Sequence, residues 1–201
     1  MGQLLHTGLY FLYASAMVYL VGTWRFFRLP GISSLLVRGG FLLHVAAGVA
    51  LTLIYTYYYT DRSKADIYRF FNDGRIISSV LFTNPVAWLK IITGIGYHDP
   101  DAWQYLARTL HFSHPEGDLV TSYSFFIRLV SVLNLLSFNN IFIDTLLLNF
   151  IAFTGLVLLY KAFQHYFADL PVALFIGVFL LPSVVFWGSG LLKEALVLVG
   201  A

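Results

Sequence analysis

Acidic and basic side chains gather directly after an apolar stretch, between Asp61 and Gly74, where they could act at a membrane surface. Asp66, Arg69 and Asp73 have the i, i+3, i+7 spacing that places side chains near one helix face, and Tyr68 flanks them. A carboxylate at the edge of low dielectric is costly to bury unless it is paired or bound to a ligand. Asp66 could therefore be a general base for an acceptor hydroxyl. The alternative is a solvated helix start, with Asp66 at the positive end and Arg69 paired locally.

A second charged group, Lys193 and Glu194, interrupts an apolar run near the end of the chain. Pro182 predicts a kink or an end in the preceding helix, and glycines on both sides of Ser189 predict a tight turn. Ser189 is then the expected N-cap of the next helix. A cation at a helix start suits a phosphate. The alternative is that Lys193 reaches toward the headgroups while Glu194 complements the helix dipole.

Histidines and carboxylates near residues 98–118 raise the possibility of a divalent cation. They are His98, Asp99, Asp101, His111, His114, Glu116 and Asp118. Their spacing matches no specific metal signature, and the prolines and glycine among them are typical of surface turns. We therefore predict no metal ligands and leave a divalent cation as the one open cofactor.

The composition of the 201 residues indicates a membrane protein. Hydrophobic residues make up 59% and charged residues 11%, against about 25% charged in soluble domains. The absence of cysteine excludes disulfides and thiolate chemistry. No basic run suits nucleic acid, so membrane lipids are the expected surroundings.

Apolar segments predict an all-α, polytopic transmembrane helix bundle. The four predicted spans are Leu4–Trp24, Phe41–Thr60, Ile141–Phe163 and Leu170–Gly188, and a fifth begins at Leu191. We expect one membrane domain over 1–201, the N-terminal part of a longer protein.

Charge predicts the orientation of these spans. Arg25, Arg28 and Arg38 lie in a short connection without acidic residues, which the positive-inside rule assigns to the cytoplasm. Residues 61–123 then form a long outer loop. Within it, Ile76–Phe82 and Val86–Ile95 are expected to be amphipathic juxtamembrane helices.

The segment Phe125–Phe138 decides on which side the second charged group lies. It is apolar but too short to cross comfortably, so we interpret it as interfacial or re-entrant. Lys193 and Glu194 then share the outer side with Asp66. If the segment crossed the membrane, they would lie on the opposite side.

Two short motifs resemble known families. The sequence from Asp66 to Phe70, followed by Asn72, Asp73 and Gly74, resembles the first outer loop of GT-C membrane glycosyltransferases. The block from Pro182 to Glu194 resembles a segment of multi-spanning bacterial proteins that make surface polysaccharides. Ala65 stands where the class usually has glycine or a second acid, so both Asp61 and Asp66 are candidates for the key acid. The N-terminal span is extra relative to the simplest members.

The resemblance implies an inverting sugar transfer from a polyprenyl-phosphate-linked donor to a lipid, glycan or protein acceptor, in a bacterial inner membrane. The resemblance also implies that Asp66 is the general base and that the substrates are bound by Tyr68, Arg69, Lys193 and Glu194. A polysaccharide polymerase or ligase, a transporter and a membrane subunit without a site remain alternatives. A transporter predicts repeated halves and broken helices at the midplane. Polar groups at one interface and the absence of a sequence repeat favour the enzyme.

Overall fold

The computed structural model describes residues 2–59, 65–112 and 121–200, and all regular secondary structure in those ranges is helical. This confirms the all-α class. The chain forms two compact units, each described by itself below. The bundle unit comprises 1–54 and 145–201, and the loop unit comprises 55–144. The predicted outer loop, 61–123, falls inside the loop unit.

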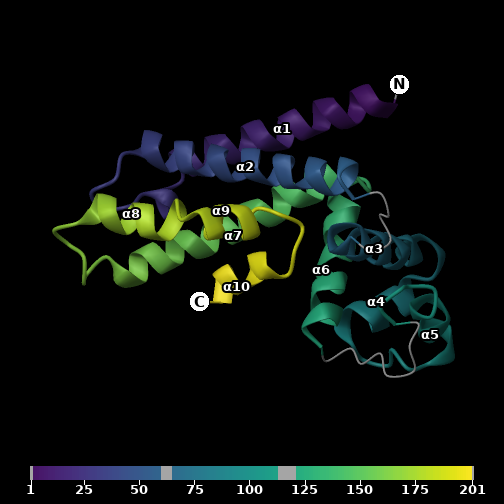
Figure 1. Ribbon diagram of the computed structural model, residues 1–201. Helices are drawn as coiled ribbons and strands as arrows, with labels where there is room; N and C mark the ends of the chain where they lie inside the picture. The colour runs from purple at the N-terminus through teal and green to yellow at the C-terminus, as the bar shows by residue number, and fades with distance from the viewer. Residues whose placement is uncertain (1, 60–64, 113–120, 201) are drawn as a thin grey trace. The chain divides into compact units, whose positions relative to one another are not determined.

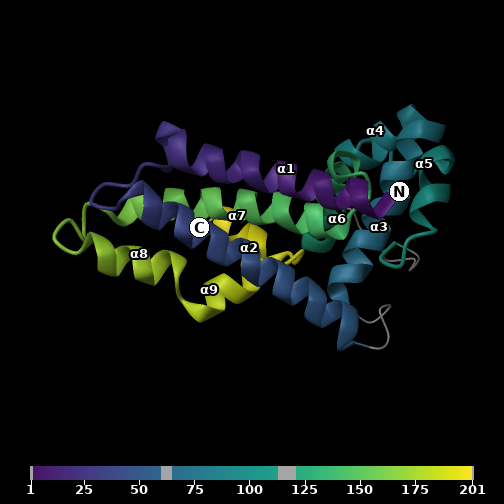
Figure 2. The ribbon, with the colours of Figure 1, turned by 90° about the horizontal axis from the view of Figure 1, so that it is seen from above.

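The bundle unit is built on long helices that lie side by side (Figures 1 and 2). Its elements are α1 (Gly2–Thr23), the short 3-10 helix η1 (Arg25–Phe27), α2 (Ser34–Tyr57), α7 (Ile141–Phe163), α8 (Pro171–Phe179), α9 (Pro182–Trp187) and α10 (Glu194–Gly200). The last turn of α2 and the first turn of α7 belong to the loop unit.

Three helices in the described part of the chain are long and apolar enough to cross a membrane: Leu4–Thr23, Ser34–Tyr57 and Ile141–Phe163. They correspond to the first three predicted spans. The fourth, Leu170–Gly188, is divided into α8 and α9. Pro182 has no N–H, and Leu181 before it is extended (φ −60°, ψ 129°), so one helix ends and another begins there. The fifth is represented by α10, of seven residues.

Aromatic rings fill the core of the bundle unit. Phe153 of α7 lies 5.2 Å from the ring of Phe41 in α2 and 5.1 Å from that of Phe179 in α8. All three side chains are fully buried. By contrast, α1 leaves Leu4, Leu5 and other large apolar side chains exposed, which suits a helix surrounded by lipid.

The loop unit contains α3 (Asp66–Thr83), α4 (Pro85–Thr93), α5 (Pro100–Leu106) and α6 (Ser122–Ser137). The two segments predicted to be juxtamembrane helices are helical, as the second half of α3 and most of α4. Pro100 was expected in a surface turn, but it opens α5, where a proline at the first position loses no helical hydrogen bond. Asn84 ends α3 and caps α4 by accepting from the N–H of Ala87 at 3.1 Å.

Helix α6 covers the predicted interfacial segment and has 16 residues, short for a membrane crossing. It packs tightly on α3, because a Cβ on Gly74 would come within 2.7 Å of Val130. Two of its polar side chains donate to backbone carbonyls inside the unit: Asn134 to that of Phe71 at 3.3 Å, and Arg128 to that of Ile92 at 3.1 Å. Arg128 and Asn134, the polar residues that distinguish this segment from a lipid-facing span, thus bond backbone groups of the loop unit.

Candidate functional site

Asp66 is an accessible carboxylate at the first turn of α3. Its side chain is 63% exposed, and Oδ1 lies 3.8 Å from Nη1 of Arg69, whose side chain is 44% exposed. A pair this loose and solvated contributes little to stability. The carboxylate is therefore held near a cation without being buried by it, so a substrate group could reach it.

Tyr68 points toward the end of α2. Its hydroxyl lies 2.6 Å from that of Thr56. This contact links the start of α3 to the last turn of α2, within the loop unit. Tyr68 therefore positions the helix that carries Asp66. Asp61, the alternative key acid, lies outside the described residues.

Asp73 has a structural role that its spacing from Asp66 did not reveal. It is 2% exposed, and its oxygens accept the N–H groups of Leu110 and His111 at 2.9 and 3.0 Å. Burial raises the pKa of this carboxyl, while the two N–H donors oppose the rise. Asp73 thus anchors the segment after α5, and Asp66 and Arg69 form the accessible part of the predicted face.

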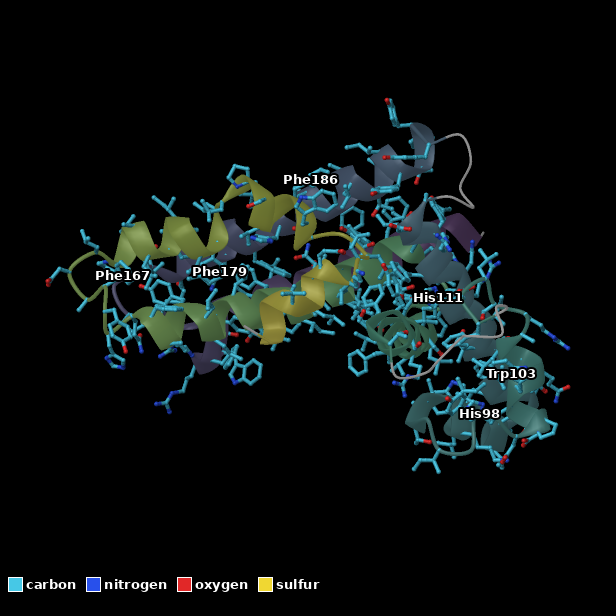
Figure 3. The ribbon with its side chains drawn as sticks, turned by 60° about the horizontal axis from the view of Figure 1, so that its bottom comes forward. His98, Trp103, His111, Phe167, Phe179 and Phe186 are labelled. Carbon is cyan, nitrogen blue, oxygen red and sulfur yellow. The ribbon has the colours of Figure 1, made fainter. Side chains whose placement is uncertain are left out.

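His98, Asp99 and Asp101, which were considered as possible metal ligands, contact other groups of the loop unit. Nζ of Lys90 bonds Asp99 at 2.7 Å and Asp101 at 3.1 Å. The ring of His98 stacks on Trp103 at 6.1 Å (Figure 3). No group of three potential metal-binding side chains occurs among the described residues. His114, Glu116 and Asp118 lie outside them.

Lys193 and Glu194 belong to the bundle unit, where Glu194 opens α10. Glu194 is exposed and lines a cavity of about 250 Å³ with α9 residues such as Trp187. Lys193 is partly buried. Asp66 and Lys193 thus lie in separate units, and a site shared between them stays a prediction.

Ser189 does not cap α10, because that helix begins only at Glu194. Ser189 is instead fully buried, and its hydroxyl lies 3.1 Å from Nδ1 of His44. His44 was not among the residues predicted for a site; it is 1% exposed and lies inside a predicted span. An ionisable residue within a span was the available signal. Asn149, in another span, donates to the His44 carbonyl at 2.7 Å.

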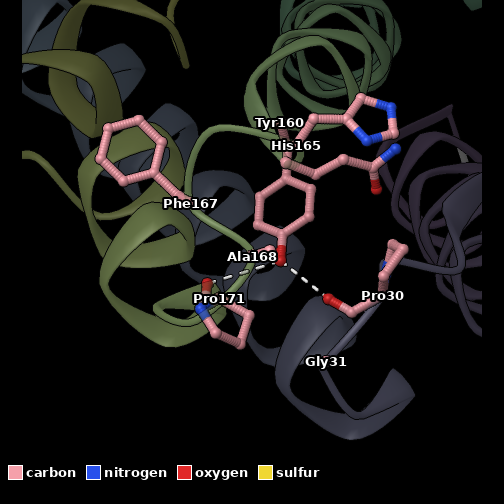
Figure 4. Close-up of a pocket in the computed structure, with 8 residues that line it drawn as sticks. Pro30, Gly31, Tyr160, His165, Phe167, Ala168 and Pro171 are labelled. Atoms are coloured by element: carbon pink, nitrogen blue, oxygen red, sulfur yellow. Dashed lines mark hydrogen bonds between the residues drawn. The ribbon is translucent and has the colours of Figure 1, made fainter.

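A second cavity, of about 360 Å³, lies at the other end of the bundle unit (Figure 4). The hydroxyl of Tyr160 donates to the carbonyl of Pro30 at 2.8 Å, and the carbonyl of Pro171 lies 3.4 Å away. A Cβ on Gly31, whose φ is 75°, would clash with Pro171 at 2.7 Å. The two connections therefore pack directly together beside the imidazole of His165.

Comparisons with known proteins found no match to this chain among family models, curated proteins or solved structures.

Proposed function

We propose that the chain belongs to a membrane glycosyltransferase that takes a sugar from a polyprenyl-phosphate-linked donor at the outer face of a bacterial inner membrane. In this proposal, α8 and α9 together form the fourth crossing and α10 starts the fifth. The observation that carries the proposal is the exposed carboxylate of Asp66, which opens a helix just after a span and has a cation one turn away.

The proposed chemistry is an inverting displacement. Asp66 removes the proton from an acceptor hydroxyl as that oxygen attacks the anomeric carbon of the sugar. The bond between the anomeric carbon and the phosphate oxygen breaks, and polyprenyl phosphate leaves with the bonding electrons. Arg69 and Lys193 stabilise the growing negative charge, while Tyr68 and Glu194 contact the substrates. A glycan acceptor would make the same chemistry a polymerase or ligase reaction.

The test compares Asp66→Asn with Asp169→Asn in the full-length protein. Asp169 is also an exposed carboxylate, but it lies in the connection before α8, at the predicted cytoplasmic end. Transfer from polyprenyl-phosphate-linked sugars is measured in proteoliposomes. We expect Asp66→Asn to lower the rate about 100-fold or more, and Asp169→Asn to leave it unchanged. Full activity in Asp66→Asn removes Asp66 as the base.

A transporter is the second candidate, and a specific observation favours it. The α8–α9 break lies beside the buried imidazole of His44, and discontinuous helices with buried polar groups are typical of transporters. Movement of a fluorescent lipid-linked sugar between leaflets, without glycosidic products and with no effect of Asp66→Asn, would support this candidate over the enzyme.

A further inference from the structure

The break between α8 and α9 leaves a backbone carbonyl that needs a donor inside the bundle. Helix α8 ends at Phe179, whose carbonyl would otherwise accept from the N–H four residues later. His44 of α2 takes that place, with Nε2 2.8 Å from the Phe179 oxygen. Within a membrane an unpaired carbonyl is costly, and this contact satisfies one of the acceptors that the break exposes.

The same contact determines the tautomer of His44. A carbonyl only accepts, so Nε2 carries the proton, and Nδ1 of the neutral ring is an acceptor. The hydroxyl of Ser189, 3.1 Å away, therefore donates to Nδ1. One buried imidazole thus holds both the end of α8 and the segment that follows α9.

Small residues on α2 and in the segment let the two backbones approach closely. A Cβ on Gly48 would lie 2.5 Å from the carbonyl oxygen of Ser189, and one on Gly190 would lie 2.4 Å from Cδ2 of Leu51. His44, Gly48 and Leu51 are spaced i, i+4, i+7 along one face of α2. That face forms a cradle for residues 189 and 190.

Residues of helix α7 contact the same part of α2 that forms the cradle. Nδ2 of Asn149 donates to the His44 carbonyl at 2.7 Å and would lie 3.3 Å from a Cβ on Gly48. The carbonyl of Gly48 accepts from Thr52, whose hydroxyl lies 3.4 Å from that of Thr145. The cradle is therefore tied to two helices, and the segment continues from it through buried Leu191 and Leu192 to Lys193.

We infer that His44 is a positioning residue: with Gly48 and Asn149 it clamps residues 188–192 and thereby fixes where Lys193 and Glu194 emerge. The role of the clamp in donor binding rests on the proposed function, whereas the clamp itself does not. Loss of the imidazole should free the segment and weaken binding of the donor phosphate, while the acceptor site near Asp66 is unaffected.

Accessibility of a cysteine in the segment tests the clamp. The chain has no cysteine, so Leu192→Cys, at a position 4% exposed, gives a single buried thiol. We expect its labelling by N-ethylmaleimide to accelerate at least about fivefold in His44→Leu, and less in His44→Gln, whose amide can still donate. Leu43→Ala, at the adjacent 45% exposed position, is the control and should change nothing. Unchanged labelling in His44→Leu overturns the inference.

Two further measurements separate the clamp from the proposed function. If His44→Leu does not fold, Ser189→Ala removes one hydroxyl and should still raise labelling. In transfer assays of the full-length protein, His44→Leu should raise KM for the lipid-linked donor and leave KM for the acceptor unchanged. Faster labelling without transfer by the unsubstituted protein defeats the proposed function and leaves the clamp intact. Faster labelling with an unchanged donor KM defeats the positioning role.

Discussion

Gly48→Ala is expected to destabilise the bundle, although alanine is the better helix former. In an open position of α2 the change should raise the free energy of unfolding by about 1 kcal/mol through helix propensity. At Gly48, however, the new methyl carbon would lie 2.5 Å from the Ser189 carbonyl oxygen and 3.1 Å from Cγ2 of Thr145. The nearest atom belongs to a backbone, so the segment itself must move.

Gly39 provides the matched control, because a Cβ there meets nothing within 4 Å in the same helix. Overpacking in a filled core costs about 1–3 kcal/mol. The propensity gain is common to both variants, so the difference in their unfolding free energies should equal this overpacking term.

The assay is unfolding of the detergent-solubilised protein by a graded denaturant, with the two alanine variants measured side by side. Gly39→Ala should unfold later than the unsubstituted protein, and Gly48→Ala earlier than Gly39→Ala by about 1–3 kcal/mol. Equal stability of the two variants would refute the close approach of the segment to α2.

Other consequences can be measured in the same way. Tyr160→Phe should lower the unfolding free energy by about 1 kcal/mol, because it deprives the Pro30 carbonyl of its donor; Tyr166→Phe, at an 82% exposed position, should not. Asp144→Asn should raise stability, since the Asp144 carboxylate is fully buried and makes no hydrogen bond of good geometry within the described residues; lower stability would reveal a partner. Burial raises the pKa of Asp73 above its ordinary 3.8, so its contribution to stability is complete in acid and is lost as pH rises through the raised value. The stability gap between the unsubstituted protein and Asp73→Asn should therefore shrink as the pH rises above about 4, and a growing gap would mean that the N–H donors outweigh burial.

Hydropathy was sufficient to predict the all-α class and the three long apolar helices, because long apolar runs leave few other structures possible in lipid. It was not sufficient for Leu170–Gly188. That run is continuously apolar, and the break depends on Pro182 together with a donor that α2 supplies. The local signal for a kink was present, but the residue that stabilises it lies 135 positions earlier.

Helical spacing grouped Asp66 with Asp73 but could not reveal their different surroundings. Asp73 accepts hydrogen bonds from the N–H groups of Leu110 and His111, which lie 37 and 38 residues later in sequence. Ser189 was predicted as an N-cap, but the next helix begins at Glu194 and the Ser189 hydroxyl has a partner 145 residues away in sequence. Periodicity describes one element, whereas these roles are set by contacts between elements.

The clamp around His44 also has a consequence for synthesis. Helix α2 enters the membrane long before its partners exist, because Asn149, Phe179 and Ser189 follow 105, 135 and 145 residues after His44. At a synthesis rate of about 5–20 residues per second, Ser189 is made roughly 7–30 s after His44. During that interval the polar groups on this face of α2 lack the partners that they have in the folded chain. The contacts around His44 can therefore be complete only after Ser189 has been synthesised.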